Sequence, residues 1–108
     1  MSFKVIPTPP FERELKQLAK KYSSLKNDIF NIVQELLINP RIGKSLGGDC
    51  YKVRMAISSK GRGKSSGARL ITYVQIIDQN IFLIAIYDKS EMASLTEKDI
   101  RQRLKRIK

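Results

Sequence analysis

The sequence has no histidine, one cysteine and 10 acidic residues against 21 basic ones. Without histidine it lacks the usual general base at neutral pH and the commonest metal ligand. Cys50 alone cannot form an internal disulfide, and with no histidine to activate it we expect a packed, unreactive thiol in a reducing compartment. No apolar stretch is long enough for a signal peptide or a membrane span. We therefore expect a soluble, cytoplasmic protein with no metal site.

The excess positive charge is concentrated in one part of the chain. Of a formal net charge of +11 over 108 residues, the segment 41–69 carries eight cations and one acid, a net charge of +7. The last eight residues, 101–108, form a second basic patch with five cations and no acid. Clustered cations attract polyanions by releasing counterions, although a basic face can also serve solubility alone. The charge therefore points to a nucleic-acid partner.

Three segments show the spacing of amphipathic helices. The first follows Thr8-Pro9-Pro10, with Thr8 as the expected N-cap, and the second ends near Asn39-Pro40. The third follows Ser94-Leu95-Thr96-Glu97, which has the spacing of a capping box. Their apolar faces consist of Phe11, Leu15, Leu18 and Tyr22; Ile29, Val33, Leu36 and Leu37; and Ile100, Leu104 and Ile107.

Alternating or β-rich segments predict four strands, at residues 2–7, 51–57, 68–77 and 81–87. The segments between them are expected to be a loop at 41–49, a flexible cationic loop at 58–67 and a three-residue turn at 78–80. The order is β-α-α-β-β-β-α. It predicts one α+β domain over residues 1–108, with an antiparallel sheet covered by two N-terminal helices and a C-terminal helix.

The alternation in 51–57 places Lys52 and Arg54 on the face opposite the apolar residues. If 58–67 connects a long hairpin, Arg54 lies across from about Ile71, and Lys52, Arg54, Arg69 and Tyr73 share one face. The turn at 78–80 would place Tyr87 opposite Ile71 and beside Arg69. Asp88 and Glu91 follow directly, and either can pair with the basic loop.

Such a face has the groups needed to bind and cleave RNA. Lys60, Arg62 and Lys64 would hold phosphates around it, and Tyr73 or Tyr87 would stack on a base or, for Tyr87, pack in the interior. Cleavage needs a base for the 2′-hydroxyl, stabilisation of the phosphorane charge and a proton donor. Lys52 can act as the base because neighbouring cations disfavour its protonated form, while Arg54 and Arg69 stabilise the transition state and Tyr87 assists proton transfer.

The sequence resembles the RelE/ParE superfamily of bacterial toxins, and most closely its RelE and HigB-type branch. The resemblance covers nearly the whole chain. It is carried by the order of elements and by the segments Cys50–Arg54, Ser59–Ile71 and Ile86–Glu91, followed by Leu95-Thr96.

The resemblance implies a RelE-like α+β fold and an endoribonuclease that enters the ribosomal A site, cuts messenger RNA and is neutralised by an antitoxin encoded beside it. It assigns phosphate binding and catalysis to Lys52, Arg54 and Arg69, and a basic contact to Lys89. Relatives often have a C-terminal Tyr or His, and here no aromatic residue follows Tyr87, so Tyr87 takes that part or catalysis is mainly electrostatic.

Two alternatives stay open. One is a ParE-like inhibitor of DNA gyrase, a branch that lacks the nuclease residues. The other is a basic RNA-binding module without catalysis.

Overall fold

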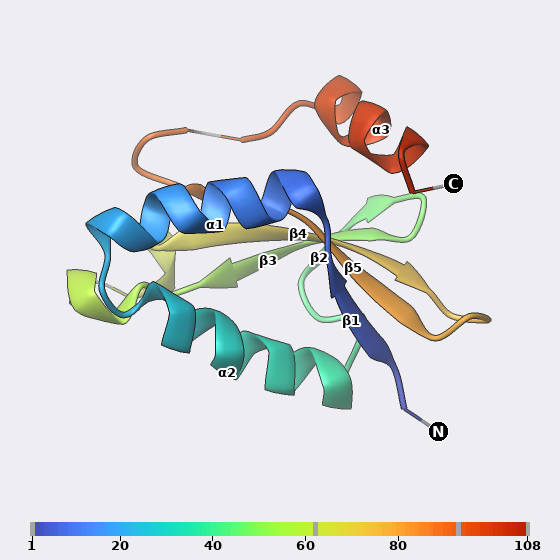
Figure 1. Cartoon of the computed structure of the whole chain (residues 1–108), viewed down its shortest axis with the longest axis horizontal. Coiled ribbons are helices and arrows are strands. Elements are labelled where there is room, and N and C mark those ends of the chain that lie inside the picture. The colour runs from blue at the N-terminus through green and yellow to red at the C-terminus, as the bar shows by residue number, and fades with distance from the viewer. Residues whose placement is uncertain (1, 62, 93, 108) are drawn as a thin grey trace.

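Two helices follow the first strand and pack beside each other on one face of a five-stranded sheet (Figure 1). The structure, a computed structural model, describes residues 2–61, 63–92 and 94–107. After β1 (Lys4–Pro7), the chain forms α1 (Pro9–Lys21) and α2 (Leu25–Ile38). Thr8 is the residue before α1 as predicted, but its hydroxyl donates a 2.7 Å hydrogen bond to the Leu83 carbonyl instead of capping the helix.

The strand order in the sheet is β1-β5-β4-β3-β2. The other four strands are β2 (Lys44–Gly47), β3 (Cys50–Met55), β4 (Ala68–Gln75) and β5 (Asn80–Asp88). β1 is parallel to β5, and the remaining pairs are antiparallel. The α+β class is therefore confirmed, but the sheet is mixed and not antiparallel throughout as predicted.

β2 was not predicted, because it lies in the segment expected to be a loop. All four of its residues are exposed, so neither face shows the apolar alternation that identifies a half-buried strand.

The main core lies between the sheet and the two N-terminal helices. Phe11, Leu25 and Leu36 from the helices pack against strand residues that include Val53 and Leu70, all almost fully buried. The predicted apolar face of α1 is therefore its packed face, whereas the predicted face of α2 is only partly right, because Leu37 is 40% exposed and Leu25 and Ile32 are buried as well.

A smaller cluster on the opposite face of the sheet lies under α3 (Glu97–Lys105). Ile100 and Leu104 of α3 pack there on Ile71 and Tyr73. Thr96 is the N-cap of α3, and its hydroxyl accepts a 3.1 Å hydrogen bond from the Asp99 backbone N–H. The capping box predicted from Ser94 was therefore wrong, because the cap lies two residues later. In the part of the chain that the structure describes, no helix is long and apolar enough to span a membrane.

The hairpin between β4 and β5 differs from the predicted one in two ways. Its turn contains four residues, Ile76–Gln79, not the three at 78–80, and Ile77 is 96% exposed. In addition, the pairing shifts by one residue between Ile71 and Thr72, which makes Ile84 an extra, bulged residue of β5.

Candidate nucleic-acid interface

The arginines of β3 and β4 lie directly opposite each other. Arg54 pairs in register with Arg69, and Lys52 pairs with Ile71. The predicted register, with Arg54 across from Ile71, was wrong by two residues. Because side chains alternate with a period of two, a two-residue error leaves every side chain on its face. Lys52, Arg54 and Arg69 therefore share a face, as predicted.

Tyr87 lies on the same face because of the β5 bulge. It pairs with Arg69, not with Ile71 as predicted, while Ile71 pairs with Ala85. The turn alone sets a register in which Thr72 pairs with Leu83. If the strands kept that register to the end of β5, without the extra residue Ile84, Tyr87 would point to the sheet face that α1 and α2 cover. A shift of one residue moves every later side chain of a strand to the opposite face of the sheet.

The cations from several elements line one open groove of about 760 Å³ beside β3. Six basic side chains line it: Lys44, Lys52, Arg54, Lys64, Arg69 and Lys89. Glu35 of α2 is the one acidic residue among the described lining residues, and it forms no ion pair with them. The groove is therefore a strongly positive concave surface, which suits a polyanion.

Lys44 and Glu35 were not assigned to the site from the sequence. Lys44 reaches the groove because β2 pairs it with Lys52. Gly43 precedes it at φ +102°, where a Cβ would lie 2.5 Å from the Lys52 carbonyl oxygen. Gly43, directly before Lys44, was the feature of the sequence that could have indicated this position, because such a close approach of two backbone segments requires glycine. Glu35 gave no such signal, since it occupies an ordinary helical position.

Arg69 is a buried cation without a carboxylate partner among the described residues. Its residue is 3% exposed, and its guanidinium donates to the carbonyl oxygens of Lys64 at 2.9 Å, Ala68 at 3.1 Å and Ser65 at 3.3 Å. Burial and then the neighbouring charge of Arg54 lower the pKa of Arg69. Two uncompensated guanidinium groups side by side repel each other, and a bound anion would relieve that repulsion.

The segment 58–67, predicted to be a flexible cationic loop, has short regular turns among its described residues. It contains two 3-10 turns, η1 (Ser58–Lys60) and η2 (Lys64–Ser66). Asp28 of α2 holds the first turn by accepting hydrogen bonds from the Ser58 backbone N–H, at 2.9 Å, and from the Ser58 hydroxyl. Of the predicted phosphate-binding cations here, Lys64 lines the groove, whereas Arg62 lies outside the described residues.

Lys60 forms a buried ion pair instead of lining the groove. Its ammonium lies 2.8 Å from Asp88, whose side chain is 0% exposed. Asp88 also accepts hydrogen bonds from the Tyr22 hydroxyl at 2.6 Å and from Ser90. Of the two acids proposed to pair with the basic loop, Asp88 does so, whereas Glu91 pairs with Lys21 of α1. The role of Lys60 in RNA binding stays a prediction.

The Asp88 carboxyl makes the stability of the protein depend on acid. Burial alone would raise its pKa, but the hydrogen bonds from Lys60, Tyr22 and Ser90 outweigh burial and hold the pKa well below its usual range. A depressed carboxyl pKa stabilises the fold above the unfolded-state value of about 4, and this contribution is lost as the pH falls below it. We expect the free energy of unfolding of the wild type to fall more steeply below about pH 4 than that of Asp88→Asn.

Urea unfolding of both proteins at several pH values between about 7 and 2 measures this difference. Asp88→Asn should be the less stable protein at neutral pH, and the gap should narrow on acidification. Parallel pH curves for the two proteins would contradict the assigned role of the carboxyl.

The two predicted aromatic residues are buried on the α3 face of the sheet. Tyr73 is 9% exposed and stacks on Phe82, with ring centroids 6.0 Å apart. Tyr87 is 5% exposed, and burial raises the pKa of its hydroxyl. That hydroxyl has no hydrogen-bond partner of good geometry among the described residues, although the Leu95 backbone lies near it. Neither ring is placed to stack on a base here, and both roles stay predictions.

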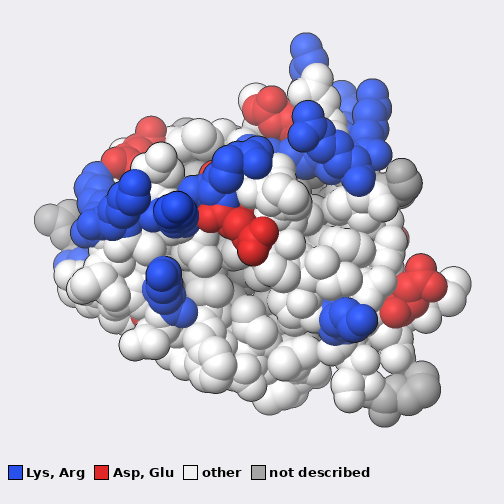
Figure 2. All heavy atoms as spheres, in the orientation of Figure 1, with Lys and Arg blue, Asp and Glu red and all other residues white. Residues whose placement is uncertain are grey.

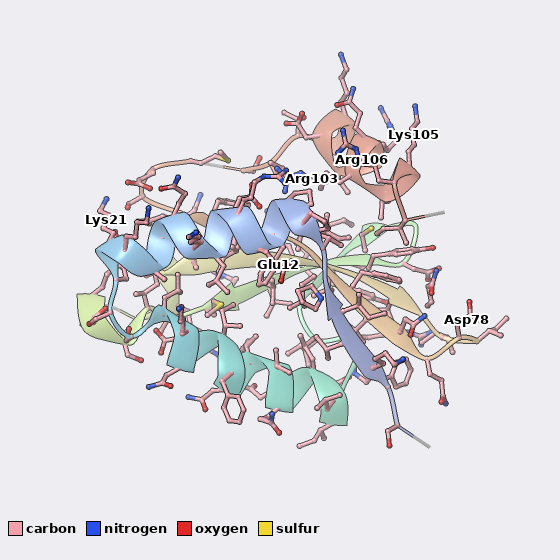
Figure 3. The ribbon with its side chains drawn as sticks, viewed as in Figure 1. Glu12, Lys21, Asp78, Arg103, Lys105 and Arg106 are labelled. Atoms are coloured by element: carbon pink, nitrogen blue, oxygen red, sulfur yellow. The ribbon has the colours of Figure 1, made fainter. Side chains whose placement is uncertain are left out.

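A second basic surface covers α1 and α3. Figure 2 shows Lys and Arg side chains gathered over these helices. One of them, Arg103, forms a bidentate pair with Glu14 of α1, at 2.9 and 2.8 Å, and donates to the Ile84 carbonyl at the bulge (Figure 3). These hydrogen bonds connect α3 to α1 and β5.

Among residues 2–61, 63–92 and 94–107, no group of Cys, Asp and Glu side chains is arranged to hold a metal ion.

Comparisons with known proteins agree with this fold. A double arginine-to-alanine mutant of the E. coli toxin RelE in the free state is 26% identical, with a TM-score of 0.63 and coverage of 100% of both chains. A chain of the intact E. coli RelBE toxin–antitoxin complex is 25% identical, with a TM-score of 0.62, and the match covers 80% of this chain and 95% of that one.

A third solved structure, the same RelE mutant bound to a peptide of the antitoxin RelB, is 26% identical, with a TM-score of 0.58 and coverage of 90% and 98%. The family model for the RelE toxin of the RelE/RelB toxin–antitoxin system matches residues 4–107. This protein therefore belongs to the RelE toxin family.

Proposed function

We propose that this toxin is a ribosome-dependent endoribonuclease that cleaves messenger RNA without a metal ion. The observation that carries the proposal is the pair Arg54 and Arg69, opposite each other in register and without a carboxylate partner among the described residues. They lie in a groove whose other cations are four lysines. Such a groove binds a phosphate backbone and stabilises additional negative charge on one phosphate.

In the proposed reaction the 2′-hydroxyl oxygen attacks the adjacent phosphorus, and the bond from phosphorus to the 5′-oxygen breaks. Lys52 accepts the proton of the hydroxyl, which requires its neutral form. Arg54 and Arg69 stabilise the charge that develops on the non-bridging oxygens. The upstream product ends in a 2′,3′-cyclic phosphate, and the leaving oxygen takes a proton from water and becomes the 5′-hydroxyl of the downstream product. Lys64 and Lys89 hold flanking phosphates.

Tyr87 contributes only if its buried hydroxyl becomes accessible. Because burial raises the pKa of the hydroxyl, it stays protonated at neutral pH, so it can donate a proton but cannot accept one.

The RelBE complex and the peptide complex support an antitoxin as the protein partner of this chain, and the proposed substrate makes the ribosome a second partner. A toxin with these two partners would act in the cytoplasm, where ribosomes translate messenger RNA.

Induced expression followed by mapping of messenger RNA 5′ ends tests the activity. We expect growth arrest with new 5′ ends within translated regions, and purified toxin should cut a messenger RNA only when ribosomes are present. Arrest with intact transcripts and accumulating DNA damage would replace this proposal with gyrase inhibition. Normal growth with salt-dependent RNA binding would replace it with a non-catalytic binding module.

A further inference from the structure

The three consecutive carbonyl groups of turn η2 each accept a hydrogen bond from a cationic side chain. Arg69 donates to the carbonyl oxygens of Lys64 and Ser65, at 2.9 and 3.3 Å. Lys60 donates to the carbonyl oxygen of Ser66 at 2.9 Å. The backbone N–H of Lys89 continues the series at the Gly67 carbonyl, at 3.0 Å. Lys60 and Arg69 are therefore joined through one short turn.

Lys60 is itself held by Asp88 at the end of β5. Its side chain is 14% exposed and that of Asp88 is 0% exposed, so the ion pair is shielded from water. Lys60 also lies 5.2 Å from the centre of the Tyr22 ring, and the Tyr22 hydroxyl donates to Asp88. Asp88 at the end of β5 and Tyr22 directly after α1 thus hold the Lys60 ammonium, and the ammonium holds η2 through the Ser66 carbonyl.

We propose that Asp88 and Lys60 are positioning residues that set the place of the Arg69 guanidinium in the groove. Arg69 needs such support because the adjacent Arg54 repels it, and among the described residues only backbone carbonyls of Lys64, Ser65 and Ala68 accept its side-chain hydrogen bonds. If η2 moves, the guanidinium moves with the two carbonyls it holds there. The inference rests on the proposed ribonuclease function, in which Arg69 contacts the scissile phosphate.

The rate of the chemical step, and not the binding of RNA, is the quantity expected to change. Of the six described cations in the groove, only Lys64 belongs to η2, whereas Lys44, Lys52 and Arg54 belong to β2 and β3, so most of the attraction for RNA persists when η2 is loosened. A displacement of about 1 Å in a group that stabilises the transition state can slow a reaction by about 100-fold. Loss of the Asp88–Lys60 pair should therefore lower the single-turnover rate of cleavage and leave the half-saturating concentration nearly unchanged.

If Lys60 instead binds an RNA phosphate directly, its loss should raise the half-saturating concentration and leave the single-turnover rate unchanged. Removing a phosphate contact weakens binding and lowers the slope of binding against salt by about one, while the reaction of bound RNA proceeds normally.

Lys60→Met tests the inference, because methionine keeps the apolar stem and removes the ammonium. We expect a fall of about 30-fold in the single-turnover rate, with the half-saturating concentration within about twofold of the wild type. Lys21→Met is the matched control (Figure 3). Lys21 also lies over the Tyr22 ring, at 5.4 Å, and is paired with Glu91 at 2.6 Å, but it does not contact η2. The Lys21→Met protein should cleave RNA at the wild-type rate.

Two further variants separate positioning from stability. In Lys60→Met with Asp88→Asn both members of the buried ion pair are neutral, so resistance to urea should recover relative to Lys60→Met while the cleavage rate stays low. Lys60→Arg retains donors for both Asp88 and the Ser66 carbonyl and should restore most of the rate. Recovery of the rate together with stability in the double variant would overturn the inference.

A folded Lys60→Met protein that cleaves within about threefold of the wild type would also overturn it, as would a change confined to RNA binding. NMR of the Arg69 side-chain N–H groups gives a readout that needs no cleavage. The guanidinium should be rigid in the wild type and in Lys21→Met, and mobile in Lys60→Met. If the wild type cleaves no RNA, the proposed function fails, while this measurement still decides whether Lys60 orders Arg69.

Discussion

Replacing Arg69 with alanine is expected to lower the rate of messenger RNA cleavage by about 1,000-fold. Arg69 as a residue is 3% exposed and stands opposite Arg54, so its charge acts on a bound phosphate with little screening by water. No described carboxylate neutralises it. Single-turnover cleavage of one messenger RNA on ribosomes, at saturating toxin, measures the effect.

Alanine at position 69 also removes the hydrogen bonds that Arg69 donates to the Lys64 and Ser65 carbonyls of η2, so a fall in activity must be separated from a loss of folding. Arg69→Lys keeps a charge but not the forked geometry, and it should recover only a small part of the rate. Arg101→Ala, which removes an exposed cation paired with Glu97 on α3, should cleave normally. A folded Arg69→Ala protein that cleaves at the wild-type rate would remove Arg69 from the catalytic group.

The largest expected loss of stability follows from replacing Gly67 with alanine. A Cβ at this position would lie 2.1 Å from the Met55 carbonyl oxygen and 2.9 Å from the Ala56 Cα. These are backbone atoms, so the contact can be relieved only by separating the chain segments where β3 and β4 meet. We expect the free energy of unfolding, measured in urea, to fall by about 3 kcal/mol.

Gly48→Ala is the control for the loss of glycine itself. Gly48 has φ +57°, and a Cβ added there would meet no heavy atom within 4 Å, so alanine has only the cost of a left-handed backbone, about 1 kcal/mol. Gly67 is not in the left-handed region, and its penalty is steric. An equal decrease in the free energy of unfolding in both variants would show that the backbone around Gly67 moves apart without a steric penalty, which contradicts this prediction.

Local patterns predicted those parts of the fold that have a buried face. The spacing of Phe11, Leu15 and Leu18 identified α1 because these side chains do pack on the sheet. The same reasoning missed β2, all of whose residues are exposed, and it could not show that β1 lies parallel to β5. That pairing depends on contacts between the two ends of the sequence, which no local window contains.

For the site, alternation correctly placed Lys52, Arg54 and Arg69 on one face and tolerated a two-residue error in register. It could not show which part of that face α3 covers, so Tyr73 was expected to be available to RNA and is packed on Phe82. The position of Tyr87 depends on the bulge at Ile84, for which the sequence carries no turn residue or glycine. Composition counted Lys60 as surface charge because the burial of its partner, Asp88, is a tertiary property.

The parallel contact between β1 and β5 makes the groove a property of the complete chain. Thr8 and Leu83, joined by hydrogen bonds next to this contact, are 75 positions apart in the sequence. The groove draws its cations from β2, β3, η2, β4 and the segment after β5, so it forms only when these distant contacts close together. A partly folded chain still carries the same positive charge and should attract polyanions, but its arginines are not aligned. Toxicity should therefore follow the cooperative folding transition and not the amount of basic polypeptide present.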